Sequence, residues 1–181
     1  MLANQVSQAS VILKNGGIIA YSTETVLGLG CDPFNNEAVN RILCLKNRAV
    51  ENGLIMLVDS ISSLQQHTTA LSADQLDSIT SAENTTWLVP TKEQVPSWVR
   101  GKHEKLAVRI TNHPVANLLS ATTQGIISTS ANISAYKTLK NRQEIWDWFG
   151  PHVDYVLIDC AGSGTPSQIC DLLSGKILRS N

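Results

Sequence analysis

The chain has 181 residues, 43% of them hydrophobic and 16% charged, and a net charge of −1. This length predicts one globular domain over residues 1–181. The near-neutral charge argues against a dedicated nucleic-acid binder, which normally carries a basic excess. No run approaches the roughly 18 apolar residues of a membrane span, and no N-terminal targeting segment is visible, so we expect a soluble cytoplasmic protein without membrane contact.

Helices and strands alternate in the first part of the chain. Apolar residues recur with helical spacing in some segments and form short continuous runs in others. In chain order, the patterns predict a helix at 6–14, a strand at 18–21, a loop or second strand at 22–30, a helix from Asn35 or Asn36 to 45, and an apolar strand at 54–58.

Predicted strands are more frequent in the second part of the chain. The same reasoning predicts short helices near 63–67 and 73–79, strands at 85–89 and 105–110 around a loop at 96–101, a helix at 115–121, a strand at 125–127, a helix at 142–149, and strands at 153–158, 169–172 and 177–178. This order predicts an α/β fold with a twisted mixed β-sheet flanked by helices, rather than a purely parallel sheet.

Several common motifs are missing from this sequence. It has no phosphate-binding P-loop, no third glycine after Gly28-Leu29-Gly30, and no G-x-S-x-G nucleophile elbow. The four cysteines have no zinc spacing, so we expect reduced and mostly buried thiols at Cys31, Cys44, Cys160 and Cys170. Because the glycine-rich nucleotide-binding motifs are missing, a bound nucleotide would have to be held by groups outside those motifs.

Two segments carry cationic residues that are candidates for binding an anion. Lys46 and Arg48 follow an amphipathic helix, where they either complement the helix dipole or clamp a phosphate. Arg109 lies inside the apolar strand 106–110, and a buried arginine needs an anionic partner, either a carboxylate or a ligand.

Two hydroxyl-rich segments follow predicted strands. Residues 21–25 (YSTET) are consistent with amine binding, with water ordered around a metal, or with a self-contained Ser/Thr turn. Residues 128–132 (STSAN) could bind base, ribose and phosphate, or form a turn. Ser167 and Arg179 are weaker candidates, and the four histidines are scattered.

Together these pieces are more specific than any one of them. YSTETVLGLG at 21–30, Lys46-x-Arg48, Ala107-Val108-Arg109 and STSANIS at 128–134 occur in this order. The series resembles the YrdC family, in its bacterial short form, over nearly the whole chain. The resemblance implies a twisted α/β sheet with a basic concave cavity.

The family resemblance also implies a reaction. L-threonine, bicarbonate and ATP, with a magnesium ion, would give threonylcarbamoyl-adenylate and pyrophosphate. A partner transferase would then modify adenosine 37 of tRNA, so tRNA is an indirect partner. The chemistry needs fixed cations and no covalent nucleophile, because it brings two anions together and spreads charge over phosphate oxygens.

By resemblance, the site residues divide between the substrates. The expected threonine-binding residues are Thr23, Arg109, Ser128 and Ser167. The expected ATP-binding residues are Lys46, Arg48, Asn52, Ser130, Asn132, Thr138 and Arg179. Lys46, Arg48 and Arg109 would be catalytic, and no side chain is expected to be a metal ligand.

The sequence departs from the family pattern at three places. Ser22 stands where a proline is usual, Ala82-Glu83-Asn84 stands where many relatives have Pro-Gly-Pro, and Ala135 replaces a glycine, although Thr86 is retained. Glu83 would add an anion near a basic rim, which puts tight RNA binding in doubt more than catalysis.

Two other functions remain open. One is a module that binds double-stranded or ribosomal RNA, as a ribosome maturation factor does, through the same cavity and the cations Arg100, Lys102, Lys105 and Arg109. The net charge and an expected scarcity of exposed aromatic residues argue against it, leaving at most weak RNA binding. The other is carbamoyl-phosphate chemistry, whose enzymes carry additional zinc-finger and acylphosphatase segments that this sequence lacks.

Overall fold

The computed structural model describes residues 2–133, 136–159 and 162–180. Within these residues nine strands form one sheet: β1 (Ile19–Tyr21), β2 (Gly28–Gly30), β3 (Ile55–Val58), β4 (Thr85–Pro90), β5 (Lys105–Ile110), β6 (Ile126–Ser130), β7 (Tyr155–Leu157), β8 (Gln168–Asp171) and β9 (Ile177–Arg179). Their order is β7-β1-β2-β6-β3-β5-β4-β8-β9. The pairs β1–β7, β3–β5 and β4–β8 are parallel and the others antiparallel, which confirms the predicted mixed sheet.

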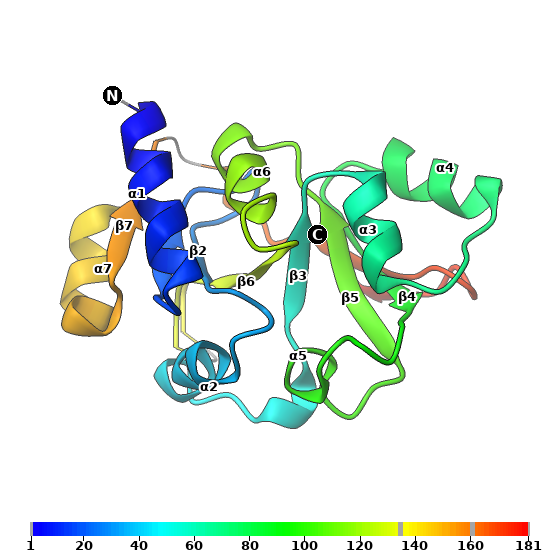
Figure 1. The fold of residues 1–181 in the computed structure, drawn as a ribbon, viewed down its shortest axis with the longest axis horizontal. Helices are drawn as coiled ribbons and strands as arrows, with labels where there is room; N and C mark the ends of the chain where they lie inside the picture. Colours follow the sequence, from blue (N-terminus) through cyan, green and yellow to red (C-terminus); the bar gives the residue numbers. More distant parts are fainter. Residues whose placement is uncertain (1, 134–135, 160–161, 181) are drawn as a thin grey trace.

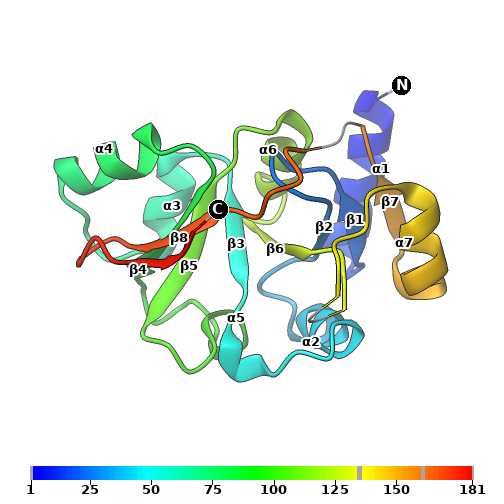
Figure 2. The same ribbon diagram turned by 180° about the vertical axis from the view of Figure 1, so that it is seen from behind.

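Helices flank this sheet, as predicted. They are α1 (Leu2–Lys14), α2 (Asn36–Leu45), α3 (Ile61–His67), α4 (Ala73–Ser81), α5 (Ser97–Arg100), α6 (Pro114–Ser120) and α7 (Arg142–Phe149), with 3₁₀ turns η1 (Val50–Asn52) and η2 (Gly150–His152). Helices α1 and α6 pack side by side, α2 and α5 meet at one end of the sheet, and α7 lies beside the edge strand β7 (Figures 1 and 2).

Side-chain caps explain why several helix starts could be predicted. The Asn35 side chain accepts a hydrogen bond from the Ala38 N–H at 3.0 Å. Ser72 forms a capping box with Gln75 at the start of α4. Each cap satisfies a backbone N–H that has no partner within the helix, so the helix begins where the capping residue stands.

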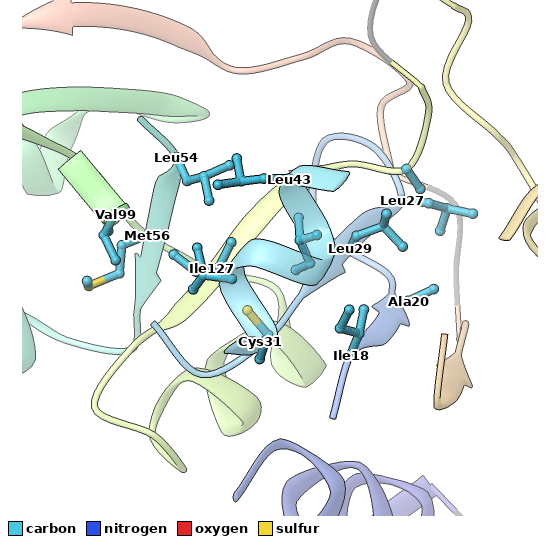
Figure 3. Packing of buried hydrophobic residues seen from close by; sticks show 14 of the residues in the cluster. Ile18, Ala20, Leu27, Leu29, Cys31, Leu43, Leu54, Met56, Val99 and Ile127 are labelled. Carbon is cyan, nitrogen blue, oxygen red and sulfur yellow. The ribbon is translucent and has the colours of Figure 1, made fainter. Parts of the chain in front are cut away.

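The core lies on both faces of the central strand β3, because successive side chains of a strand point to opposite faces. Met56 and Val58 belong to a large cluster that includes Leu43 of α2, and Figure 3 shows Leu43 beside Leu54. Leu57 belongs to a second cluster, with residues of α1 and α6. These clusters fix the sheet so that its polar residues are held on a rigid support.

Two predicted elements need correction. The expected loop at 96–101 contains the short helix α5. The predicted strand at 125–127 was placed too early, because β6 runs from Ile126 to Ser130. This strand is interior and pairs with both β2 and β3, so backbone hydrogen bonds draw its polar end into the sheet.

The cysteine prediction is confirmed for two positions only. Cys31 and Cys170 are buried and Cys44 is exposed, and all three are free thiols. Cys160, Ser134 and Ala135 lie outside the described residues. Among the helices of the described chain, none combines the length and apolar character needed to cross a membrane.

Candidate functional site

A cavity of about 770 Å³ opens over the middle strands of the sheet. The strand register explains its floor, because Ser130 pairs with Gly28, and Ile55 pairs with both Ser128 and Ala107. Residues paired in neighbouring strands point to the same face. Side chains far apart in the sequence therefore meet over one row of the sheet.

Eight of the predicted site residues line this cavity. They are Thr23, Arg48, Asn52, Arg109, Ser128, Ser130, Ser167 and Arg179. Lys46, Asn132 and Thr138 are outside its lining. The fold therefore brings most of the predicted site residues together in one cavity.

Gly28 keeps part of the cavity floor open. A Cβ atom on this residue would lie 3.3 Å from Ser128 Oγ and 3.6 Å from Thr23 Cγ2. A larger side chain would therefore fill the space between these two predicted threonine-binding residues.

Three of the four arginines that line the cavity were predicted site residues, namely Arg48, Arg109 and Arg179. Arg48 donates to the Gly53 carbonyl at 2.8 Å, and Arg179 donates to the Ser167 carbonyl at 2.6 Å. Partial burial lowers the pKa of Arg179, and the nearby charges of Arg109 and Arg48 lower it further. Like charges so close together favour an anion in the space between them.

Arg109 lies deepest of these cations, at 5% exposure. Its Nε lies 3.0 Å from Glu24 Oε1, although the N–H is not aligned for a hydrogen bond. Burial lowers the pKa of Arg109, while Glu24 and Tyr21 raise it. Of the two partners that the sequence allowed for this arginine, a protein carboxylate is therefore present, and the guanidinium also reaches the cavity.

The hydroxyl groups mostly have protein partners. Thr23 Oγ1 donates to the Val26 carbonyl at 2.7 Å and accepts from the Thr25 N–H at 3.2 Å, which is the self-contained turn that the sequence left open. Ser167 Oγ and Thr86 Oγ1 are 2.8 Å apart. Such bonds fix the direction of each hydroxyl while leaving lone pairs for a ligand.

Lys46 is buried behind the cavity at 2% exposure. Its Nζ donates to the carbonyls of Ser130 at 2.5 Å and Asn132 at 2.6 Å, and to Asn132 Oδ1 at 3.1 Å. Burial and the charge of Arg48 lower the pKa of Lys46 to about 8. The ammonium thus holds the end of β6. Thr138, which was also predicted to bind ATP, is half-buried and does not line the cavity.

One departure from the expected family pattern has a local explanation, which is Ser22 in place of a proline. Ser22 donates its backbone N–H to the Leu157 carbonyl at 3.2 Å, and its hydroxyl accepts from the Asp159 N–H at 3.2 Å. A proline could make neither bond. Glu83 lies before β4 and is not among the residues that line the cavity.

Three further cations lie at the cavity rim, where no enzymatic role was predicted. Arg100, Lys102 and Lys105 line it, although the sequence had grouped them only as an RNA-binding patch. Lys105 is paired with Asp171 and lowers the pKa of that carboxyl to about 2. Against six lysine and arginine side chains, Glu104 is the single carboxylate among the described lining residues.

Comparison with known proteins supports a family assignment. A family model for Sua5/YciO/YrdC proteins, described as "Telomere recombination", matches residues 11–181. The chain is 38% identical to threonylcarbamoyl-AMP synthase of Acinetobacter baumannii, over 99% of this chain and 100% of that protein. It is 41% identical to the protein of the same name from Pseudomonas aeruginosa PAO1, over 94% of each chain.

Solved structures agree with the fold. P. abyssi Sua5 complexed with L-threonine is similar with a TM-score of 0.85 and 26% identity, over 96% of this chain and 53% of that longer chain. This protein therefore spans about half of Sua5. E. coli YciO, at 22% identity, has a TM-score of 0.83 over 98% of this chain and 89% of its own. The chain belongs to the Sua5/YciO/YrdC family.

Proposed function

We propose that this protein is an ATP-dependent enzyme that synthesises threonylcarbamoyl-AMP, the activity for which its relatives are named. The observation that carries the proposal is the convergence of Arg48, Arg109 and Arg179 on one cavity lined with hydroxyl groups. A phosphoanhydride and a carboxylate need such fixed cations, and a P-loop is not required to supply them.

The proposed reaction begins when the amine of L-threonine attacks the carbon of bicarbonate, a C–O bond breaks, and water leaves, which gives a carbamate. A carbamate oxygen attacks the α-phosphorus of ATP, the bond to the bridging oxygen breaks, and pyrophosphate leaves. Arg109 would hold the carboxylate or carbamate, and Arg48 and Arg179 would face the phosphates, with Asn52 and Ser130 beside the nucleotide. Fixed cations lower the barrier because charge on the phosphate oxygens increases in the transition state.

Magnesium fits this site as part of the nucleotide substrate. Among the described residues no three His, Cys, Asp or Glu side chains form a group that could hold a metal ion. Mg²⁺ usually keeps several waters and binds substrate phosphates with few protein ligands. We therefore expect MgATP to bring the ion to the cavity.

The product suits a downstream transfer to tRNA. A mixed anhydride of a carbamate and AMP is an activated donor, and partner transferase proteins would pass its threonylcarbamoyl group to adenosine 37. This assignment places the protein in the cytoplasm, where tRNA, ATP and threonine are all present.

One assay tests the proposed function directly. The purified protein is incubated with magnesium, ATP, bicarbonate and isotopically labelled L-threonine, and the products are examined by mass spectrometry. We expect labelled threonylcarbamoyl-AMP and an equal amount of pyrophosphate, and neither when bicarbonate is removed. Absence of the adenylate under complete conditions would overturn the proposal.

An RNA-binding function has one specific observation in its favour. Arg100, Lys102 and Lys105 line the cavity rim, as the sequence suggested for an RNA site. The expected scarcity of exposed aromatic residues was wrong, since Tyr136 and Trp146 are each 60% exposed, but neither lines the cavity. RNA affinity that falls steeply with salt and is unchanged by ATP would favour the binding module.

A further inference from the structure

Two side chains behind the cavity support the Arg109 guanidinium. Glu24 Oε1 lies 3.0 Å from Arg109 Nε, and Glu24 Oε2 accepts a hydrogen bond from Thr111 Oγ1 at 2.9 Å. Thr111 is 1% exposed and Arg109 is 5% exposed. The two oxygens of one carboxylate therefore connect the arginine to a buried hydroxyl at the end of the same strand.

This arrangement leaves the other end of Arg109 available. Among the described residues, no hydrogen bond engages either terminal nitrogen of Arg109, although the residue lines the cavity. Two terminal N–H donors on a planar group match the two oxygens of a carboxylate or carbamate. The direction in which they point depends on what holds the Nε side of the group.

We infer that Glu24 and Thr111 are positioning residues that aim Arg109 at the carboxylate of the amino-acid substrate. This inference rests on the proposed function. The sequence offered amine binding or metal hydration for the segment that contains Glu24, but both carboxylate oxygens of Glu24 face Arg109 and Thr111. Fixing a binding group before the substrate arrives reduces the entropy lost on binding.

The backbone around both residues is also held. Thr111 donates its N–H to the Val58 carbonyl at 3.0 Å, and its carbonyl accepts from Asn117 Nδ2 at 3.2 Å. The Glu24 carbonyl accepts from the Ser163 N–H at 3.0 Å. Because both backbones are fixed, loss of the Thr111 hydroxyl cannot be repaired by a small shift of the chain.

The test removes the hydroxyl and keeps the side-chain volume. In Thr111→Val we expect the KM for L-threonine to rise roughly tenfold, because Glu24 loses one of its two anchors, while the KM for ATP changes by less than about twofold. Thr111→Ser retains the hydroxyl and should keep a KM for threonine near that of the wild type. Thr123→Val is the matched control, because its buried hydroxyl donates to the Gly125 carbonyl at 2.6 Å and it does not line the cavity.

A second readout is independent of turnover. In protein carrying ¹⁵N-arginine, the Nε–H of Arg109 is shielded from water, so its exchange should be slow in the wild type and in Thr123→Val. Faster exchange is expected in Thr111→Val and in Glu24→Gln, because each loosens the guanidinium. Arg109→Lys assigns the signal by removing it.

The two readouts separate the failure of the inference from that of the proposed function. If the wild type makes no adenylate, the function is wrong, while the exchange measurement still tests the support of Arg109. If Thr111→Val leaves both the KM for threonine and the Nε–H exchange at wild-type values, the positioning role is wrong. The positioning role is also wrong if Thr123→Val raises the KM for threonine as much as Thr111→Val does.

Discussion

Lys46 and Arg48 are two positions apart, but the structure gives them different surroundings. The three donors of the Lys46 ammonium face Ser130 and Asn132 oxygens, whereas Arg48 reaches into the cavity. A phosphate could bind Lys46 only by displacing one of these oxygens. We therefore expect Lys46 to act chiefly by holding the end of β6, and Arg48 to bind phosphate.

The pKa of Lys46 predicts opposite effects of pH on stability and activity. Its pKa falls from 10.5 in the unfolded chain to about 8 in the folded protein, so between these pH values the unfolded chain binds more protons. The contribution of Lys46 to the free energy of unfolding therefore rises with pH across this window. Activity should fall over the same window, because a neutral amine has lost one donor to the β6 end.

Urea unfolding and adenylate formation, measured from neutral pH to 10.5, check this prediction. Lys46→Met has no titrating group at this position, so its unfolding free energy should lack the rise that the wild type shows. Identical pH dependence of stability in the two proteins would contradict the low pKa of Lys46.

Arg48→Ala should weaken ATP binding without unfolding the protein. Arg48 is half-buried and bonds only to the carbonyls of Asn52 and Gly53 among the described residues. Loss of one charge-assisted contact corresponds to roughly 10- to 100-fold in the Kd for ATP. Calorimetric titration measures it, and Arg41→Ala is the control, because Arg41 pairs with Asp154 at 3.0 Å and does not line the cavity. Equal Kd values for the two variants would remove Arg48 from the phosphate site.

At the scale of elements, the connection from β7 to β8 shapes the site. These strands lie at opposite parts of the sheet order, so the segment at 162–167 crosses the sheet, as Figure 2 shows. On the way the Ser163 N–H binds the Glu24 carbonyl at 3.0 Å, and the Gly164 N–H binds the Thr25 carbonyl at 2.8 Å. The crossing segment therefore holds the loop that carries Glu24 and brings Ser167 to the cavity.

Gly162→Ala should disturb this crossing. A Cβ atom there would lie 2.4 Å from the Thr25 carbonyl oxygen and 2.5 Å from that of Thr23, which is closer than real contacts allow. We expect a loss of about 1–3 kcal/mol in the free energy of unfolding and a raised KM for threonine, because the Thr23–Thr25 loop must move.

Gly175→Ala is the control for this substitution. Gly175 has a positive φ of 69° and open space around the added Cβ, so only backbone strain of about 1–2 kcal/mol is expected, with an unchanged KM for threonine. Urea unfolding and steady-state kinetics on both variants measure the difference. An unchanged KM in Gly162→Ala would show that the crossing segment does not position the loop.

Local signals decided which elements the sequence could predict. The strand at Lys105–Ile110 and the helix at Arg142–Phe149 have the predicted bounds, because apolar spacing and an Asn141 cap mark them. The end of β6 was missed because its polar residues gain their strand conformation from pairing with β2 and β3. Glu24 and Thr111 carried no signal of their link, since 87 residues separate them.

At the scale of the molecule, charge is strongly segregated. The whole chain has a net charge of −1, yet six lysine and arginine side chains and one glutamate are found among the described cavity residues. A cavity lined by one sign of charge concentrates anions regardless of the total charge. The net charge of the whole chain therefore does not predict which ligands this cavity attracts, and the expectation of at most weak RNA binding can be measured directly.

The cations at the cavity rim predict how strongly RNA binding depends on salt. If the cavity serves ATP and threonine, a double-stranded RNA should bind weakly, because only Arg100, Lys102 and Lys105 of the six cations among the described cavity residues remain for its phosphates. The logarithm of affinity should then fall with the logarithm of salt concentration with a slope of about −2 to −3, one unit for each phosphate contact. MgATP should displace the RNA, because both anions are attracted by the same cationic side chains of the cavity.

Fluorescence titration of labelled RNA at several salt concentrations, with and without MgATP, distinguishes the outcomes. Arg100→Ala should reduce the magnitude of the slope by about one, because one phosphate contact is lost. A steep slope that persists in this variant, together with RNA binding that MgATP does not affect, would favour the RNA-binding function and would show that Arg100 does not contact the RNA. Displacement by MgATP would instead mean that the same cations that attract RNA at the rim draw the nucleotide toward Arg48, Arg109 and Arg179.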